Sequence, residues 1–312
     1  MLDVEHLAAR VRDAAGLQGK RDLAILGRLP GAPDGDDAAV LPHGDGFLLL
    51  CGEAIAADLL AADPYAAGAA AVVTNVSDIR AMGGRPLGLV DMVVSPDRAH
   101  AEAVLDGIGW AAGLLGVDVV GGHLTIGHGP SLSASCTGVA RRPLRARAAR
   151  AGDRILAAFS LEGEYRGDAP FFSSLRHRAP AQLRDDGEAL VEVAERESCH
   201  AARDVSMPGT AGSLLQLLEC NRLGATLDVD AVPRPEGISP ERWMLTFPSF
   251  GFVLLSPPDR VAEAAEPFQR RGLACAECGT VDDSGVLRLA AGDCTAVVWD
   301  LAREPLTTLG RE

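Results

Sequence analysis

Apolar and polar positions alternate with two different periods along this chain, and the changes of period divide it into elements. Residues 1–16 carry apolar side chains at helical spacing, which predicts an amphipathic helix. Residues 38–55 hold two apolar runs on either side of Gly44–Asp45–Gly46, and glycines supply the backbone freedom of a tight reversal. We therefore expect a β-hairpin there, with Asp36 and Asp37 just before its first strand.

Two longer helices show the same start and stop signals. In the first, Asp63 can cap the amino terminus, Pro64 fits the first turn and Gly83–Gly84 can close the last turn. The same cap, proline and glycine order recurs over residues 95–116. In this half we predict strands over residues 86–94, 117–123 (running into a glycine turn) and 131–140.

The second half repeats the alternation of strands and helices. We predict strands over 154–159, 250–258, 273–281 and 285–290, and helices near 181–198, within 202–224 and over 259–272. This pattern indicates an α/β (α+β) protein with two units, which we place at residues 1–144 and 145–312. The arginine-rich stretch 141–154 would be a solvated connection, or alternatively an anion-binding strap.

The composition limits the classes of partner that we expect for this protein. The 312 residues include 43 acidic and 29 basic side chains, a net charge of −14 that repels phosphate backbones and argues against nucleic-acid partners. The seven scattered cysteines do not suggest a disulfide framework. No apolar run approaches the ~20 residues that span a bilayer, and the start is not typical of a signal peptide. We expect a cytoplasmic protein that acts on a small molecule.

Polar clusters fall at the ends of the expected elements. They are Asp36–Asp37, Asn75 with Asp78 on one helix face, Gly121–Gly122–His123, and Asp204–Val205–Ser206. Each cluster alone is compatible with a solvated turn or an exposed helix face. Together they supply hard oxygen ligands near glycines, as Mg²⁺–phosphate chemistry requires. Successive side chains of a strand point to opposite faces, so one of the two adjacent aspartates could bind metal while the other orients a metal-bound water.

The order of these clusters resembles a known family. "GDDAAV", "NVSDIRAMGGRP" followed by "LVDMVV", "VVGGHLT" and "DVS…GTAGSLLQLLE" occur as in the AIR synthase (PurM-like) superfamily. The resemblance covers about residues 20–290. It indicates an AIR-synthase-related branch near thiamine-monophosphate kinase, selenophosphate synthetase and the hydrogenase-maturation dehydratase.

That resemblance implies a fold, a cofactor and a partner. It implies a homodimer whose amino-terminal halves share a β-barrel, with ATP and Mg²⁺ as cofactors and an oxygen of a small metabolite as the group that is phosphorylated or activated. The implied metal ligands are Asp36, Asp37, Asp78 and Asp91. The implied nucleotide-binding residues are Asn75, Gly121, Gly122, Thr125, Asp204 and Ser206. His123 is the candidate proton acceptor, and Lys20, the only lysine, is a candidate phosphate ligand.

Three departures from the family pattern leave a second hypothesis open. Leu124 separates His123 from Thr125, "DVSMPG" replaces "DVSDG" so that Met207 stands where an acid is usual, and "CGEAI" replaces a "DTxVE" segment. A catalytically silent nucleotide-binding regulator with the same fold would also fit these changes.

Two further motifs have a functional and a structural interpretation. The loop 161–174 would be a flexible surface loop, or alternatively a substrate lid. Cys275 and Cys278 form a CxxC motif, but a second cysteine pair is not nearby, and both cysteines occupy positions where a strand carries apolar residues. We expect them to be core residues of a strand.

Overall fold

The computed structural model describes residues 2–29 and 35–310, which group into two compact units. One unit, the five-stranded unit, comprises Asp37–Pro143 and Arg178–Val191. The other, the seven-stranded unit, comprises residues 1–36, Leu144–His177 and 192–312. Each unit therefore takes residues from both halves of the sequence, and the division falls between Asp36 and Asp37.

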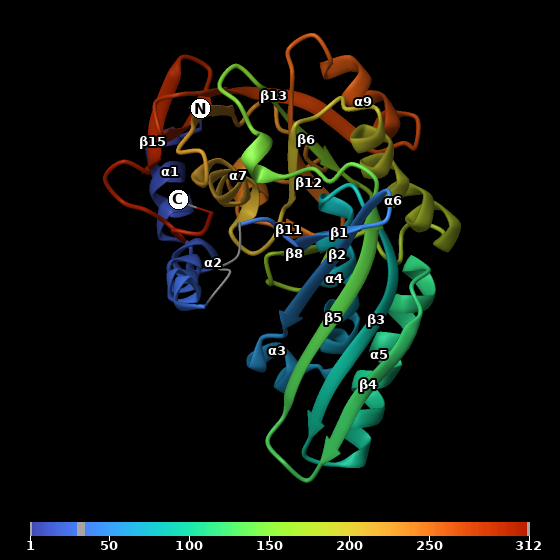
Figure 1. Cartoon of the computed structure of the whole chain (residues 1–312). Coiled ribbons are helices and arrows are strands. Elements are labelled where there is room, and N and C mark those ends of the chain that lie inside the picture. Colours follow the sequence, from blue (N-terminus) through green and yellow to red (C-terminus); the bar gives the residue numbers. More distant parts are fainter. Residues whose placement is uncertain (1, 30–34, 311–312) are drawn as a thin grey trace. The chain divides into compact units, whose positions relative to one another are not determined.

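The five-stranded unit is one mixed sheet with helices on one side (Figure 1). Its strands lie in the order β1-β2-β5-β3-β4, all antiparallel to their neighbours except the parallel pair β3–β4. Its elements are β1 (Ala39–His43), β2 (Gly46–Ala54), α3 (Ala57–Ala62), α4 (Pro64–Ala81), β3 (Arg85–Ser95), α5 (Arg98–Leu115), β4 (Val119–Ile126), β5 (Ser131–Ala140) and most of α6 (Pro180–Glu195). In this chain the described strands leave the sheet open, so a closed barrel would need strands from a second chain.

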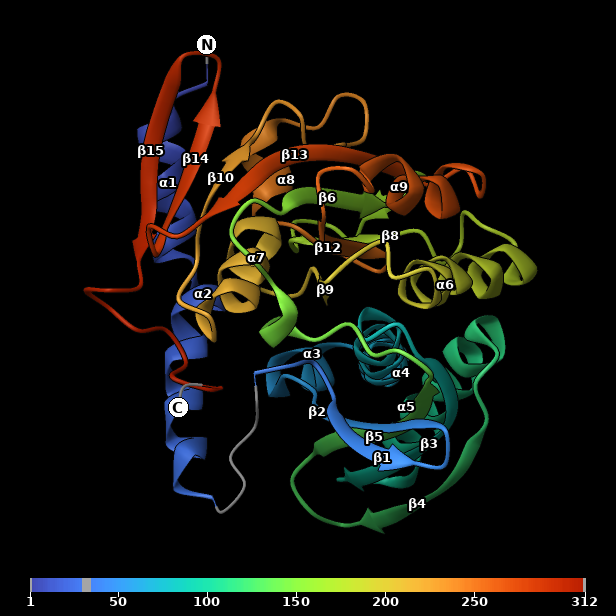
Figure 2. The ribbon, with the colours of Figure 1, turned by 45° about the horizontal axis from the view of Figure 1, so that its top comes forward.

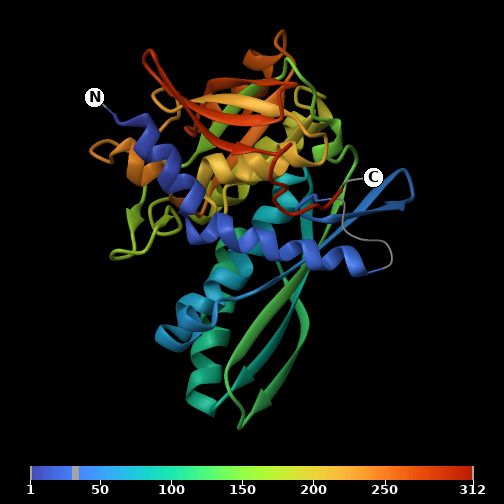
Figure 3. The ribbon, with the colours of Figure 1, turned by 90° about the vertical axis from the view of Figure 1, so that its left-hand side faces the viewer.

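Helices α4 and α5 pack against each other and cover one face of this sheet (Figures 1 and 3). Two glycines allow the close approach of the helices. A Cβ added to Gly68 would lie 2.1 Å from the Val104 carbonyl oxygen, and one on Gly107 would lie 1.9 Å from that of Tyr65. As predicted, Asp63 caps α4 by accepting a hydrogen bond from the Ala66 backbone N–H at 2.9 Å.

The other surface of the five-stranded sheet exposes large apolar side chains. Three of its strands contribute them: Leu41 of β1, Leu50 of β2 and Met92 of β3, which the strand register places on one face. Their exposed fractions run from 39% for Met92 to 50% for Leu41. A sheet that buries one face and leaves apolar residues on the other has the composition of an interaction surface.

Segment 178–191 joins this unit through arginines. Arg80, buried in α4, donates to the Leu183 carbonyl oxygen at 3.1 Å, and Arg178 forms a buried bidentate pair with Asp186 at 2.7 and 2.9 Å. Burial lowers the pKa of Arg80 to about 10, and the nearby Asp186 carboxylate partly offsets this effect. These contacts explain why the first part of α6 belongs to this unit although it comes from the second half of the sequence.

The seven-stranded unit has a mixed sheet in the order β15-β14-β10-β13-β6-β12-β9. Its strands are β6 (Arg154–Phe159), β9 (Ala201–Asp204), β10 (Gly224–Asp228), β12 (Gly251–Ser256), β13 (Ala274–Asp282), β14 (Val286–Ala291) and β15 (Cys294–Asp300). Its helices are α1 (Val4–Asp13), α2 (Ala15–Gln18), η1 (Gly19–Arg28), η2 (Ala146–Ala148), α7 (Gly209–Glu219), α8 (Pro240–Met244) and α9 (Val261–Gln269). Helix α1 lies along β14 and β15 (Figure 2), and every residue of α7 is buried.

The structure confirms the predicted hairpin, the two capped helices and the strands in the centre of each sheet. It adds β10, α8 and β15, which the sequence pattern did not indicate. The glycine turn predicted after residue 120 is wrong, because Gly121 and Gly122 lie inside strand β4. No helix in the described part of the chain is both long and apolar enough to cross a membrane.

The arginine-rich stretch is not a solvated connection. Leu144, Ala146 and Ala149 are buried in the seven-stranded unit, and Arg145 forms an ion pair. The apolar residues between the arginines were the signal for this burial.

Loop 161–174 is ordered by a small sheet of β7 (Glu164–Tyr165), β8 (Phe171–Ser173) and β11 (Phe247–Pro248). The Tyr165 hydroxyl lies 2.7 Å from the Thr246 hydroxyl, and the Arg242 guanidinium stacks 3.7 Å from the Tyr165 ring centroid. These contacts hold both ends of the loop, which favours a fixed surface element over a free lid.

Candidate metal centre

Asp37 and Asp78 bring two carboxylates together in the five-stranded unit. Asp37 precedes buried Ala38 at the entry to β1, and Asp78 lies in the last turns of α4 with only 7% of its surface exposed. Each offers a carboxylate oxygen, and these atoms lie within 4.8 Å of each other. Opposite ligands of Mg²⁺, bound at about 2.0–2.1 Å, are roughly 4 Å apart, so this spacing suits a shared cation after small side-chain adjustments.

Two buried thiols lie close enough to Asp78 to interact with its carboxylate. Cys51 and Cys136 face each other on β2 and β5, and both thiols are buried. Burial, followed by the Asp78 carboxylate, raises the pKa of Cys136 to about 11, and the same two causes raise that of Cys51 further. Both thiols therefore stay protonated at neutral pH and do not supply a negative charge to a cation.

Asn75 lies inside the five-stranded unit. It is fully buried, its Nδ2 donates to the Ala71 carbonyl oxygen at 2.8 Å, and its Oδ1 accepts from the Cys51 thiol at 3.4 Å. These bonds fix α4 against β2, one turn before Asp78. We interpret Asn75 as a residue that positions the helix, and its predicted role in nucleotide binding stays a prediction.

Asp36 differs from Asp37, its neighbour in sequence. Its side chain is 3% exposed, Oδ1 accepts the Ala146 backbone N–H at 2.8 Å, and Oδ2 accepts Arg145 Nε at 3.0 Å. Both oxygens are thus engaged within the seven-stranded unit. We interpret Asp36 as an anchor of the chain, and its predicted metal ligation stays a prediction, as does the expected asymmetry of the two aspartates.

Asp91 lies outside the group of carboxylates to which Asp37 and Asp78 belong among the described residues. It is 7% exposed on β3, and burial raises the pKa of its carboxyl group. Gly122 faces it on β4, and a Cβ there would lie 2.8 Å from Asp91 Oδ1. Gly122 is therefore needed to leave room for Asp91, which is a structural reason for a glycine in this strand.

His123 and Thr125 lie on strand β4 with Leu124 between them. Because strand positions alternate between faces, the extra residue places both polar side chains on the same side, and His123 Nε2 lies 3.2 Å from Thr125 Oγ1. His123 pairs in register with Met92 of β3, a residue of the exposed apolar surface. The inserted leucine thus preserves the pairing of histidine with threonine.

The remaining predicted residues lie in the seven-stranded unit, apart from Gly121 in β4. Asp204 is the last residue of β9, and the Ser206 N–H donates to Ser213 Oγ at 3.1 Å in the turn that starts α7. Met207, 59% exposed, follows this turn. Lys20 lies on η1, a helix without buried residues. Their predicted roles stay predictions.

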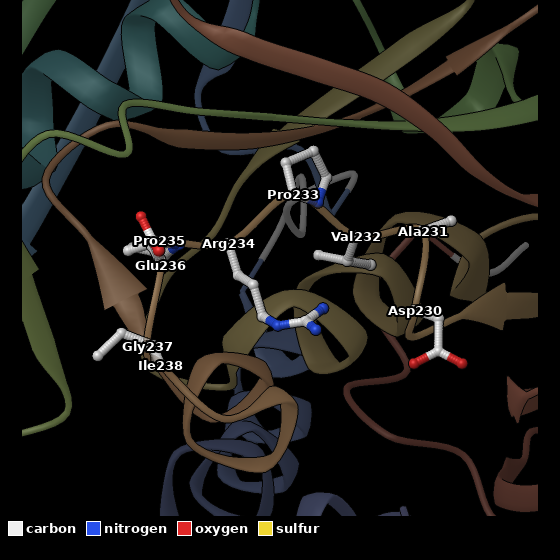
Figure 4. A pocket seen from close by; sticks show the side chains of 9 residues that line it. All are labelled: Asp230, Ala231, Val232, Pro233, Arg234, Pro235, Glu236, Gly237 and Ile238. Atoms are coloured by element: carbon white, nitrogen blue, oxygen red, sulfur yellow. The ribbon is translucent and has the colours of Figure 1, made fainter.

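Two other candidate features carry no sign of chemistry. A polar hollow of about 410 Å³ is lined by the single loop 230–238 (Figure 4), which contains none of the predicted site residues. Cys275 and Cys278 are buried in β13, whose pairing with β6 shifts register between Glu277 and Gly279, and burial raises the pKa of Cys275 to about 12. They are core residues, as the strand pattern predicted.

Comparison with known proteins identifies the class to which this site belongs. The N-terminal domain model of AIR synthase related proteins matches residues 35–140, and the C-terminal domain model matches residues 162–292. The uncharacterized protein sll0787 of Synechocystis sp. is 36% identical over 88% of this chain and 85% of its own length. The uncharacterized protein MJ0640 of Methanocaldococcus jannaschii is 33% identical over 76% of this chain and 75% of its own length. The chain belongs to the AIR synthase-related (PurM-like) family.

More distant relatives include longer proteins. The PurL subunit of phosphoribosylformylglycinamidine synthase from Thermomicrobium roseum is 28% identical over 82% of this chain, which spans only 38% of that subunit. The T. maritima PurL structure complexed with ATP has a TM-score of 0.81 at 21% identity, covering all of this chain and 53% of PurL. AaThiL complexed with AMPPCP and TMP has a TM-score of 0.64 at 19% identity over 85% of this chain and 91% of AaThiL. These structures show the shared two-domain fold.

Proposed function

We propose that this protein is an ATP- and Mg²⁺-dependent enzyme that phosphorylates or otherwise activates an oxygen atom of a small metabolite. The observation that carries this proposal is the approach of the Asp37 and Asp78 carboxylates to within 4.8 Å, in a chain of the AIR synthase-related family. The nucleotides in the titles of related structures support ATP as the cofactor.

Asp37 and Asp78 would hold Mg²⁺. The ion would neutralise charge on the β- and γ-phosphates as the bond to the γ-phosphoryl group breaks. Two like charges this close repel, and a divalent cation removes the repulsion without protonation of either group. His123, whose Nε2 lies 3.2 Å from Thr125 Oγ1, is the proposed proton acceptor from the metabolite.

A homodimer is part of the proposal. The apolar surface of the five-stranded sheet and the outer edge of β4 are exposed in the single chain, and both are features that a second copy would cover. Two such sheets could close the shared β-barrel that the family resemblance implies. His123 and Thr125 lie on the same strand, so the dimer would place them at or near its interface.

The function is tested with purified protein, ATP and a panel of small oxygen-containing metabolites. We expect Mg²⁺-dependent ATP binding and metabolite-dependent ADP release, with both lost in Asp37→Asn. Asp45→Asn, which changes an exposed aspartate in the β1–β2 turn, is the matched control and should behave as wild type. Wild-type protein that does not bind ATP in the presence of Mg²⁺ would refute the proposal.

Met207 supports a second candidate function. A methionine with 59% exposure stands where the family pattern has an acid, so the loop before α7 lacks one potential metal or proton ligand. A nucleotide-binding regulator would bind ATP and Mg²⁺ tightly but would not release ADP with any metabolite of the panel. Replacing Met207 by Asp should then increase turnover from zero if only this acid is missing.

A further inference from the structure

The carboxyl end of α7 holds two separate segments of the seven-stranded unit. The first is the strap, Leu306–Leu309. Glu219, 1% exposed, accepts hydrogen bonds from the backbone N–H groups of Leu306, Thr307 and Thr308 at 2.8, 2.8 and 3.2 Å, and from Thr307 Oγ1 at 2.6 Å. A buried carboxylate with four donors is a strong, specific anchor.

The second segment is the turn at η2. Asn221, two residues after Glu219, donates from Nδ2 to the carbonyl oxygens of Ala146, Arg147 and Ala149 at 3.0–3.1 Å. Ala146 is also the residue whose N–H binds Asp36 Oδ1. The end of α7 therefore supports the backbone to which Asp36 is fixed.

Both segments meet the start of the acidic motif. Leu309 of the strap lies against Gly35, because a Cβ built on that glycine would be 3.7 Å from both Leu309 Cβ and its carbonyl oxygen. Gly35 has φ +87°, a conformation that favours glycine, and its carbonyl oxygen accepts Arg203 Nη1 at 2.8 Å. Gly35 and Asp36 are thus held by the strap, by Arg203 and by the η2 turn.

We propose that Glu219 is a positioning residue, which sets the place of Gly35–Asp36 by locking the strap and thereby orients Asp37 for metal binding. This inference rests on the proposed function, since it takes Asp37 as the metal ligand. Glu219 acts through the strap and the backbone of the motif and does not itself touch the metal or the nucleotide. The conformational entropy of residues 35–37 is lost during folding, so Asp37 is already in position when the metal binds.

The test separates position from metal binding. Glu219→Gln replaces one acceptor oxygen by an N–H₂ donor facing backbone N–H groups, and deletion of residues 306–312 removes the strap. Amide hydrogen exchange at Ala146 and at residues 35–37 reports the position of the motif. The affinity for Mn²⁺ alone, measured by electron paramagnetic resonance, reports the metal site.

We expect both variants to speed exchange at Ala146 by about tenfold or more and to weaken Mn²⁺ binding by roughly tenfold. Combining the two changes should add little to either one. Glu304→Gln, which removes the ion pairs with Arg12 and Arg21 but not the Glu219 bonds, is the control and should leave both readouts at the wild-type level. If the deletion variant does not fold, Thr307→Ala, which removes one hydroxyl and keeps the backbone donors, should show the same two effects at smaller size.

Unchanged exchange at Ala146 and unchanged Mn²⁺ affinity in folded Glu219→Gln would overturn the inference. Faster exchange with wild-type Mn²⁺ affinity would also overturn it, because the strap would then be structural only. Wild-type protein that binds no Mn²⁺ would instead refute the proposed function, and the hold of the strap on the motif would still be decided by the exchange rates.

Discussion

In the seven-stranded unit, Asp36 and Glu219 meet N–H and hydroxyl donors at 2.6–3.2 Å, whereas in the five-stranded unit Asp37 and Asp78 meet each other. A carboxylate that has donors around it stabilises the fold around it. Two carboxylates brought together repel each other, and a cation between them would remove that repulsion. The contrast is sharpest at one peptide bond, where Asp36 anchors the chain and Asp37 belongs to the candidate metal pair.

The largest effect is expected from Asp37→Asn and Asp78→Asn. Each substitution keeps the shape and removes one negative charge, so Mg²⁺-dependent ATP binding should weaken by about 100-fold, comparable to the largest losses from altered metal environments. The melting temperature of the ligand-free protein should hold or rise, because like-charge repulsion is relieved. Isothermal titration calorimetry with and without Mg²⁺, together with thermal unfolding, measures both quantities. Equal ATP affinity in all three proteins would show that the pair is structural.

The exposed surfaces of the two sheets offer a second comparison. Leu50 of β2 is 47% exposed and Val297 of β15 is 55% exposed, so each accepts a charged side chain without burial in the single chain. Leu50→Asp should weaken homodimerisation by roughly 10- to 100-fold, while Val297→Asp should leave it unchanged. Analytical ultracentrifugation over a range of concentrations distinguishes them. A wild-type monomer of 32.4 kDa at micromolar concentration would contradict the dimer.

Asp36→Asn should lower stability, in contrast to its neighbour. Asparagine can still accept the Ala146 N–H, but it loses the charge that pairs with Arg145, at a cost of about 1–3 kcal/mol. Denaturation by urea measures this cost, with Asp45→Asn as the control. A stability equal to wild type would mean that Asp36 is not the anchor that its contacts indicate.

The smallest effect is expected at Asp91. Its pKa is raised by burial, so the folded state binds this proton more tightly than the unfolded state does. Its contribution to stability is therefore greatest at acid pH and is lost as the pH rises through the folded-state pKa. Asp91→Asn should stabilise the ligand-free protein slightly at pH 7 and should not change it near pH 3. A stabilisation of equal size at both pH values would exclude ionisation of Asp91 as its cause.

Local signals in the sequence predicted much of this fold. Asp63 with Pro64 and the glycines of the β1–β2 turn act on their own neighbours, so their effects are visible in a few residues of sequence. The turn predicted at Gly121–Gly122 is wrong because sequence alone does not distinguish a turn glycine from one that makes room for a neighbour. Gly122 makes room for Asp91, which lies across the strand.

Contacts between distant residues explain the rest. Asp36 meets Arg145 across 109 positions, and Glu219 meets the strap across 87–89 positions. A single sequence does not record either pairing. The residue types and their order therefore led to the candidate site, while the separation of the anchored Asp36 from the Asp37–Asp78 carboxylate pair came from the structure.

The central claim is that Asp37 and Asp78 together hold a divalent cation against the phosphates of ATP. The most direct test is a crystal grown with Mn²⁺ and a non-hydrolysable ATP analogue, with the metal located by its anomalous scattering. We predict one peak within about 2.0–2.3 Å of a carboxylate oxygen of both residues and of phosphate oxygens, with Asp36 still bound to Ala146 and Arg145. Nucleotide bound with the metal elsewhere, or a metal held by Asp36 in place of Asp37, would contradict the account.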